Sequence, residues 1–249
     1  MKRNQQGYTD IHSHLLPGVD DGARNLSMTE KMLTMAIEQG CDRIYFTPHY
    51  VPGKRNASIA TREKRLQEVK ELIAEKNLPI EVIIGNEIYV YGDKEEIVKS
   101  IKAGEIKTMG ETSYILVEFS TAIKEQGIWE AVEVFQRYGY KVIIAHVERY
   151  ESIAKNGEAL RKLTEAGVYL QMNTESVIGG LFDRDAAWHR KLVAEGLISF
   201  FGSDAHDTEG RAPLMEDAIA FLKKKKIPEH ILERICFENP DKLIKDEYI

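Results

Sequence analysis

Short apolar runs alternate with longer amphipathic segments along the whole chain. The apolar runs predict strands over residues 7–14, 43–47, 81–87, 114–119, 141–146, 168–173 and 198–203. Helical spacing of apolar positions predicts helices over residues 27–39, 59–75, 97–103, 128–138, 158–166, 184–195, 213–224 and 228–236. Repeated strand–helix units of this length indicate a parallel sheet with helices outside it.

The boundaries of these elements follow from local signals. In the first helix, Ser27 and Glu30 are spaced as the two halves of a capping box, and Gly40 follows as a terminator. About seven strand–helix units, with no glycine-rich dinucleotide loop and no long linker, predict one domain over residues 1–249. We expect it to close into an α/β barrel, in which functional side chains gather at the carboxyl ends of the strands.

Composition narrows the class of protein. Hydrophobic residues make up 43% of the chain, enough for a large core, and the formal net charge of −6 argues against a nucleic-acid-binding protein. The basic run 223–226 is interpreted as a solvated helix end that complements the helix dipole. No apolar run approaches the roughly 20 residues of a membrane span, so we expect no direct membrane insertion. The basic N-terminus lacks the apolar segment of a signal peptide, and two cysteines make no disulfide framework, so we expect a cytoplasmic protein.

Ionisable side chains stand at the end of nearly every predicted strand. One residue separates His12 from His14, so both imidazoles lie on the same face of a strand. Each such residue alone has an ordinary explanation as a solvated acid or a hydrogen-bonded core histidine. The whole set has no such ordinary explanation, because converging buried carboxylates repel one another unless cations neutralise them. The full set is His12, His14, Asp21 (or Asp20), His49, Glu87, Glu118, His146, Asp204 and His206.

Mixed histidine and carboxylate donors predict a divalent metal centre. This donor type suits manganese, iron or zinc and does not separate them. A single ion needs only three or four protein ligands, so nine candidates are enough for two or three ions if a carboxylate bridges. No cysteine lies near the set in the sequence, which argues against a structural zinc site.

Two arginines accompany the donors. Arg149 follows His146 by three residues, and Arg211 lies in the loop after His206. A guanidinium binds a tetrahedral oxyanion through two parallel hydrogen bonds, which a lysine does less well. The alternative for each is a salt bridge to a neighbouring carboxylate such as Glu148 or Glu209. Because phosphate is the obvious oxyanion, we infer a phosphoesterase that acts by attack of a metal-bound hydroxide.

The motifs H-x-H, T-P-H, G-N-E, V-E-F, A-H-V-E-R and S-D-A-H extend over essentially the whole chain. Together they resemble the PHP superfamily, named for polymerase and histidinol phosphatase. That resemblance implies a distorted (β/α)7 TIM-like barrel with three metal ions. The segments 10–22 and 145–150 are similar, more particularly, to the manganese-dependent bacterial protein-tyrosine phosphatases of capsule and exopolysaccharide gene clusters.

The resemblance also implies roles for individual residues. The first metal site would be His12, His14, Glu87 and Asp204; Glu87 would bridge to a second site with Glu118 and His146; the third would be Asp21, His49 and His206. Asp21 is preferred to Asp20 because the Asp-Gly pair looks like the family's ligand position. Arg149 and Arg211 would stabilise the phosphoryl group, and an Asp or His beside the third metal, with Asp21 a candidate, could protonate the leaving group. The implied partner is the phosphotyrosine-bearing tail of a membrane-associated bacterial tyrosine kinase that regulates polysaccharide synthesis.

Three other functions need comparison. A cysteine-based phosphatase needs an arginine six residues after its cysteine, but Thr47 follows Cys41 and Lys242 follows Cys236 at that distance. A histidinol-phosphate phosphatase would use the same metals, and its specificity would depend on the loops after Tyr50 and Gly179. A non-catalytic, metal-stabilised binding domain is disfavoured by the intact donors and both arginines.

The sequence leaves the roles of two surface segments undecided. The loop 51–56 is basic and either meets an acidic phosphopeptide or is only a solvated loop. The methionines of the first helix allow a homo-oligomer, although packing in the core explains them more simply.

Overall fold

All the strands of this protein run parallel and follow one another around a ring. The structure is a computed structural model that describes residues 7–180 and 182–249. The basic N-terminal stretch and Leu181, in the loop after Gly179, lie outside the described residues. The strands are β1 (Tyr8–Asp10), β2 (Cys41–Phe46), β3 (His49–Tyr50), β4 (Glu81–Ile84), β5 (Glu87–Tyr89), β6 (Tyr114–Glu118), β7 (Lys141–Ile144), β8 (Tyr169–Asn173) and β9 (Phe200–Gly202).

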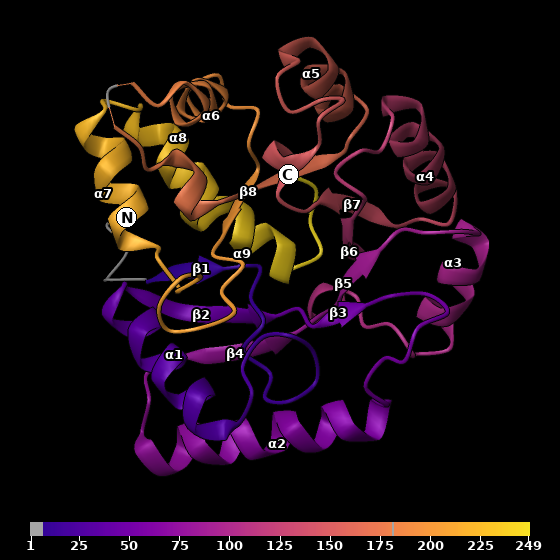
Figure 1. The fold of residues 1–249 in the computed structure, drawn as a ribbon, viewed down its shortest axis with the longest axis vertical. Coiled ribbons are helices and arrows are strands. Elements are labelled where there is room, and N and C mark those ends of the chain that lie inside the picture. Colours follow the sequence, from indigo (N-terminus) through magenta and orange to yellow (C-terminus); the bar gives the residue numbers. More distant parts are fainter. Residues whose placement is uncertain (1–6, 181) are drawn as a thin grey trace.

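Helices connect the strands and cover the outside of the ring (Figure 1). They are α1 (Leu26–Glu38), α2 (Ile59–Lys76), α3 (Lys94–Lys102), α4 (Glu125–Arg137), α5 (Gly157–Glu165), α6 (Arg184–Ala194), α7 (Glu216–Lys224), α8 (Glu229–Glu233) and α9 (Asn239–Ile244). Among the described residues no helix is both long enough and apolar enough to cross a membrane.

The ring closes through two hydrogen-bonded sheets. One has the order β1-β2-β4 and the other β3-β5-β6-β7-β8-β9, and all the pairs are parallel. The chain crosses between the two sheets three times, from β2 into β3, back from β3 to β4, and from β4 into β5. A bridge between Ser13 and Ala205 joins the two remaining edges, and the His14 N–H donates to the Ala205 carbonyl at 2.9 Å. The result is the distorted seven-part barrel that the sequence predicts.

Several element boundaries differ from the predicted ones. The predicted strand 81–87 is interrupted at Gly85 and Asn86, because its first half pairs with β2 and its second half with β3 and β6. The predicted strand 7–14 is ladder-paired only over β1 and then turns inward. The predicted helix 228–236 is α8 followed by a π-helical turn, Arg234–Glu238, and then α9, which the sequence analysis missed. Proline in the first turn of α9 is compatible with a helix, since no intrahelical N–H is needed there.

The capping box predicted for the first helix is wrong. Asn25 is the N-cap, and its side-chain oxygen accepts a hydrogen bond from the Met28 N–H at 3.0 Å. Ser27 therefore lies inside the first turn rather than at the start of the helix. Asparagine, like serine, is a preferred N-cap residue, and here Asn25, two residues before Ser27, takes that position.

The barrel interior is apolar at the amino ends of the strands. On β6 the side chains of Tyr114 and Leu116 belong to a small internal cluster, while Ile115 and Val117 pack in the larger cluster under the helices. This alternation follows from the two-residue period of a strand. The buried members of the internal cluster are Ile11, Tyr45, Met109, Tyr114, Leu116, Ile143, Ala145, Tyr169, Phe200 and Leu243. Above them, at the carboxyl ends, the inward positions become polar.

Candidate metal centre

Glu87, the first residue of β5, lies at the centre of the predicted donors. Its Oε1 is 2.8 Å from His146 Nε2 and 3.3 Å from His12 Nε2. Its Oε2 is 2.9 Å from His49 Nδ1 and 3.3 Å from His14 Nε2. One fully buried carboxylate thus touches four histidines from three different parts of the chain. This is the geometry that a bridging ligand requires.

The remaining acids complete the donor groups around Glu87. Asp204 Oδ1 lies 3.6 Å from His12 Nε2 and 3.4 Å from His14 Nε2. Glu118 places its two oxygens 3.5 Å from His146 Nε2 and 3.8 Å from His49 Nδ1. The structure therefore brings Asp204 and Glu118 to opposite sides of the same centre.

A third group lies at the edge nearest to solvent. Asp21 Oδ1 is 3.4 Å from His49 Nε2 and 3.4 Å from His206 Nε2. Among the described residues, three sets of donors are close enough together to hold an ion: His14, Asp21, His49 and His206; His12, His14 and Glu87; His49, Glu87 and Glu118. These sets differ from the expected sites, because the set for the first site lacks Asp204, that for the second has His49 in place of His146, and that for the third also includes His14.

Asp20 and Asp21 have different surroundings. The Asp20 carboxylate is 6% exposed, is bonded to His14 Nδ1 at 2.7 Å and accepts hydrogen bonds from the N–H groups of Gly22 and His49. The Asp21 side chain is 69% exposed and faces the two histidines of the third group. Asp20 thus orients His14 from behind, as carboxylates commonly do for metal-binding histidines, while Asp21 is the carboxylate that faces His49 and His206.

The imidazole hydrogen bonds show which nitrogens are free to bind an ion. His12 Nδ1 contacts Gln171 Oε1 at 3.0 Å and His14 Nδ1 contacts Asp20 Oδ2 at 2.7 Å. Both partners are acceptors, so each Nδ1 carries a proton, and when the ring is neutral its Nε2 carries the lone pair that binds an ion. The two Nε2 atoms face each other at 3.2 Å. Two lone pairs at this distance repel, and a cation between them and the carboxylates relieves the repulsion.

Unpartnered buried atoms support the same conclusion. His49 Nδ1, Glu87 Oε2 and His206 Nε2 are buried and have no hydrogen bond of acceptable geometry within the described part of the chain. Burial raises the pKa of Glu87, but His12, His14 and His146 outweigh burial and hold that pKa well below its usual value. Burial and the neighbouring Glu87 raise the pKa of Glu118. A divalent cation would satisfy these atoms and keep both carboxylates ionised, so the residues fit a metal centre.

Backbone strain accompanies two of the donors. His146 has φ +30° and Asp204 has φ +52°, in the left-handed region that residues with a side chain seldom adopt. Such conformations cost on the order of 1–3 kcal/mol and persist where the surrounding structure holds them. Each lies two residues beyond the end of a short strand, β7 for His146 and β9 for Asp204. The unusual backbone turns their side chains toward the shared centre.

Both arginines contact a donor rather than the acids nearest to them in sequence. Arg149 Nη2 lies 2.9 Å and Arg211 Nη2 lies 2.6 Å from Asp204 Oδ2. The expected alternative of a salt bridge to Glu148 is not observed, because Glu148 accepts hydrogen bonds from the Asn173 N–H and the Ser176 hydroxyl. The two guanidinium groups are about one-third exposed. Their remaining N–H groups are therefore available to an oxyanion beside the metal centre.

Gln171 and Asn173 are polar residues of the site that the sequence analysis missed. Both are buried on β8, the strand that carries none of the predicted donors. Gln171 Oε1 accepts from the His146 N–H at 2.8 Å as well as from His12, and its Nε2 donates to Asn173 Oδ1 at 3.0 Å. Asn173 Nδ2 then donates to Asp204 Oδ2 at 2.9 Å. Two polar residues at alternate positions in an otherwise apolar strand were the available signal.

A second network holds Glu87 from the side of α2. Arg62 Nη1 donates to Asn86 Oδ1 at 2.7 Å, and Asn86 Nδ2 donates to the Pro48 carbonyl at 2.8 Å. Asn86 precedes Glu87 and Pro48 precedes His49, so the network fixes two donors relative to each other. Arginine in an amphipathic helix is normally solvated, and nothing in its spacing distinguishes Arg62 from its exposed neighbours.

The fold and the donors define a parallel α/β barrel with a candidate metal centre at the carboxyl ends of its strands. The same architecture occurs in the phosphotriesterase homology protein of Escherichia coli, with a TM-score of 0.63 at 14% identity over 97% of this chain and 99% of that one, a likeness of fold alone. The chain belongs to the capsular polysaccharide synthesis family CpsB/CapC, which matches residues 8–245. Membership confirms the family expected from the motifs.

Named relatives cover nearly the whole chain. Tyrosine-protein phosphatase YwqE of Bacillus subtilis is 33% identical over 241 residues, 96% of this chain and 92% of YwqE. Tyrosine-protein phosphatase CpsB of Streptococcus pneumoniae is 28% identical over 249 residues, 96% of this chain and 99% of CpsB. A crystal structure from work on YwqE and CpsB, described there as unique metal-dependent tyrosine phosphatases, has a TM-score of 0.86 at 29% identity and covers 97% of this chain and 96% of that one.

Proposed function

We propose that this protein is a metal-dependent protein-tyrosine phosphatase that hydrolyses the phosphomonoester of phosphotyrosine. The observation that carries the proposal is the pair of arginines on Asp204, directly beside buried histidine and carboxylate donors. Relatives named as tyrosine-protein phosphatases, similar over nearly their full length, support the same activity. These relatives favour phosphotyrosine over histidinol phosphate as the substrate. A solved histidinol phosphate phosphatase is also similar to this chain, but at 22% identity the likeness is one of fold alone.

The proposed ligands form three sites, of which the first two share Glu87. His12, His14, Glu87 and Asp204 hold the first ion; Glu87, Glu118 and His146 hold the second; Asp21, His49 and His206 hold the third. We propose that the bound ions are manganese. Iron and zinc, which prefer the same ligands, are the alternatives. Divalent ions at such sites supply an activated water near neutral pH and offset the negative charge of the phosphoryl group.

The protein's own residues position the substrate for this chemistry. Arg149 and Arg211 bind the non-bridging phosphoryl oxygens with the N–H groups that do not contact Asp204, and Asp204 keeps both guanidinium groups in place. The leaving phenol has a pKa of about 10, so it needs less protonation than an alkyl alcohol. Asp21 lies at the solvent edge beside His206, where it can hold the proton that the phenolate takes up.

The proposed substrate is the phosphotyrosine-bearing tail of a bacterial tyrosine kinase that is associated with the membrane and controls capsule or exopolysaccharide synthesis. The family, named for capsular polysaccharide synthesis, and the relative named tyrosine-protein phosphatase CpsB support that assignment. We propose a cytoplasmic location, in keeping with the two free, buried cysteines Cys41 and Cys236.

Hydrolysis of a chromogenic aryl phosphate, with manganese and with a chelator, tests the enzyme class. We expect turnover that the chelator abolishes and added manganese restores. Turnover that is insensitive to chelator would overturn the metal-dependent mechanism, and no turnover at all would favour a non-catalytic binding domain. Competition between a phosphotyrosine peptide and histidinol phosphate tests the substrate, and a preference for histidinol phosphate would reject the tyrosine phosphatase.

A further inference from the structure

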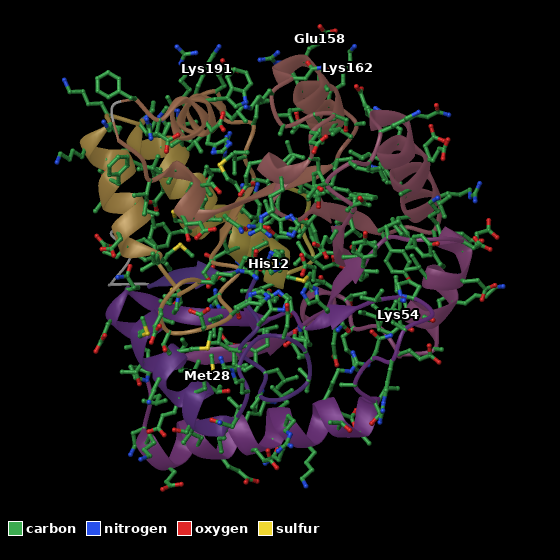
Figure 2. All side chains as sticks on the ribbon, in the orientation of Figure 1. His12, Met28, Lys54, Glu158, Lys162 and Lys191 are labelled. Carbon is green, nitrogen blue, oxygen red and sulfur yellow. The ribbon has the colours of Figure 1, made fainter. Side chains whose placement is uncertain are left out.

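The basic loop 51–56 follows β3, the strand that carries His49. Figure 2 labels Lys54 on this loop, away from His12 at the centre of the molecule and on the path from β3 to α2. Both Lys54 and Arg55 are exposed. Within the described ranges neither side chain has a salt-bridge partner. The loop therefore presents two unpaired cations on a protein whose net charge is −6.

The backbone of this loop is held in one conformation. The Lys54 N–H donates to the Val51 carbonyl at 3.1 Å, and Gly53 has φ +70°. Proline followed by glycine with positive φ is the pattern of a type II turn, in which few other residues fit the glycine position. The sequence Val51-Pro52-Gly53-Lys54 thus builds a tight turn by itself.

Asn56 closes the loop behind the turn. Its Oδ1 accepts from the Val51 N–H at 2.8 Å, and its Nδ2 donates to the carbonyls of Val51 at 2.9 Å and Lys54 at 3.2 Å. The Asn56 side chain thus satisfies three backbone groups and holds the loop in a preformed conformation. A preformed surface loses less conformational entropy on binding a partner.

The turn also limits how far the cations lie from the metal centre. The ends of a β-turn are less than about 7 Å apart between Cα atoms. Val51 follows His49 by two residues, which span at most about 7 Å. The Cα atom of Lys54 is therefore within roughly 14 Å of that of His49, a distance that an extended peptide covers in about four residues.

A shallow groove accompanies the loop on the side of α2. It has a volume of about 330 Å³ and is lined by residues that include Tyr50, Lys54, Asn56 and Arg62. Its one carboxylate, Glu105, is engaged by the hydroxyl groups of Tyr50 and Ser100 at 3.3 and 2.9 Å. The groove begins at Tyr50, next to His49, so a peptide that leaves the metal centre in this direction passes Lys54, which lines the groove and precedes Arg55 in the chain.

We propose that the loop 51–56 is a docking surface for acidic side chains that flank the phosphotyrosine of a substrate by about three to five residues. Lys54 and Arg55 contact these carboxylates while the phosphate occupies the metal centre. The proposal rests on the proposed tyrosine phosphatase activity, and it assigns the recognition of peptide charge to residues that do not touch the reacting phosphate.

The test compares two double variants that remove the same charge. Lys54→Ala/Arg55→Ala removes the cations of the loop, and Lys223→Ala/Lys224→Ala removes two exposed cations from α7. The substrates are a phosphotyrosine peptide with Asp or Glu three and four residues on either side, the same peptide with Asn and Gln there, and an aryl phosphate. Metal content is measured for each variant.

We expect the loop variant to raise KM for the acidic peptide about three- to tenfold, the size of two exposed ion pairs, and high salt to reduce the difference. The kcat, the metal content and the KM for the neutral peptide and aryl phosphate should stay at wild-type values. Asn56→Ala, which keeps the charges and loosens the loop, should raise KM for the acidic peptide less. An unchanged KM for the acidic peptide, or an equal rise in the α7 variant, would overturn the proposal.

A binding measurement separates this proposal from the activity itself. The acidic peptide is made with a difluoromethylphosphonate in place of the phosphate ester, and its Kd is measured by fluorescence anisotropy. If the wild-type protein hydrolyses no aryl phosphate, the proposed function fails, but the Kd of the two double variants still decides the role of the loop. A Kd that the loop variant leaves unchanged rejects the docking surface whatever the activity.

Discussion

The inward side chains of β6 run from Tyr114 and Leu116 to Glu118, and those of β8 run from Tyr169 to Gln171 and Asn173. At the amino end of the barrel these positions are apolar and pack against each other. At the carboxyl end the same strands present the carboxylate of Glu118 and the amides of Gln171 and Asn173, which contact His146 and Asp204 at the ends of other strands. One end thus supplies packing energy, and the other holds polar groups, of which His49 Nδ1, Glu87 Oε2 and His206 Nε2 have no hydrogen-bond partner among the described residues.

The difference indicates that the two ends of the barrel have separate roles, one in stability and the other in chemistry. Close packing below the centre resists deformation, so the strand ends above it keep their positions although their charges oppose folding. If this is correct, changes at the carboxyl end should alter metal binding and turnover, and changes at the amino end should alter stability with little effect on the chemistry of the folded protein.

The largest effect is expected at Glu87. Glu87→Gln removes the shared anionic ligand, so the protein should lose most bound metal and about 10³-fold or more in turnover, because the ions contribute several kcal/mol to transition-state stabilisation. His146→Ala should also lose metal and activity, since one proposed direct ligand disappears. Elemental analysis and aryl phosphate hydrolysis measure both. Glu81→Gln, at the exposed start of β4, is the matched control, and wild-type metal content in Glu87→Gln would exclude a bridging role.

The next effect concerns the two arginines. Arg149→Ala and Arg211→Ala should keep the bound metal but each reduce kcat by roughly 10²- to 10³-fold, the usual cost of losing one donor to a developing oxyanion charge. Arg149→Lys should recover little, because an ammonium cannot donate two parallel hydrogen bonds. Normal turnover in Arg149→Ala would assign Arg149 to holding Asp204 alone.

At the amino end, Leu116 provides the opposite test. It is fully buried in the internal cluster, so Leu116→Ala should lower the free energy of unfolding by about 2–5 kcal/mol. Below the unfolding transition, metal content and kcat per folded molecule should stay near wild type. Leu116→Met, which conserves volume, should cost less than about 1.5 kcal/mol. Urea unfolding with parallel kinetics measures both, and loss of metal in folded Leu116→Ala would show that the two ends are not independent.

The smallest effect is expected where the two regions meet, at Gln171. Gln171→Ala removes the acceptor that orients His12 and the His146 backbone, so metal affinity or kcat should fall about 10- to 100-fold. Metal titration monitored by activity measures the change. Gln136→Ala, on the exposed face of α4, serves as the control. If Gln171→Ala binds metal as tightly as the wild type and turns over equally fast, β8 contributes only to packing.

Much of the architecture was determined by the sequence alone. The two-residue and 3.6-residue periods of apolar positions predicted the order of strands and helices, because burial of one face is a local requirement of each element. Strand ends in a parallel barrel converge, so donors placed there could be predicted to meet. The loop 51–56 was also determined locally, since Pro52, Gly53 and Asn56 build its turn from neighbouring residues.

Only the tertiary structure decided which polar atoms contact one another. Hydrogen-bond partners far apart in sequence have no local signature, so the break at Asn86, the assignment of Asp20 behind His14, and Gln171 beneath His146 could not be read from spacing. Arg149 and Arg211 are 62 residues apart and follow different strands, yet both reach one oxygen of Asp204. Residue types and their periodicity determine what each strand end offers; closure of the barrel brings those ends to one point and determines their contacts.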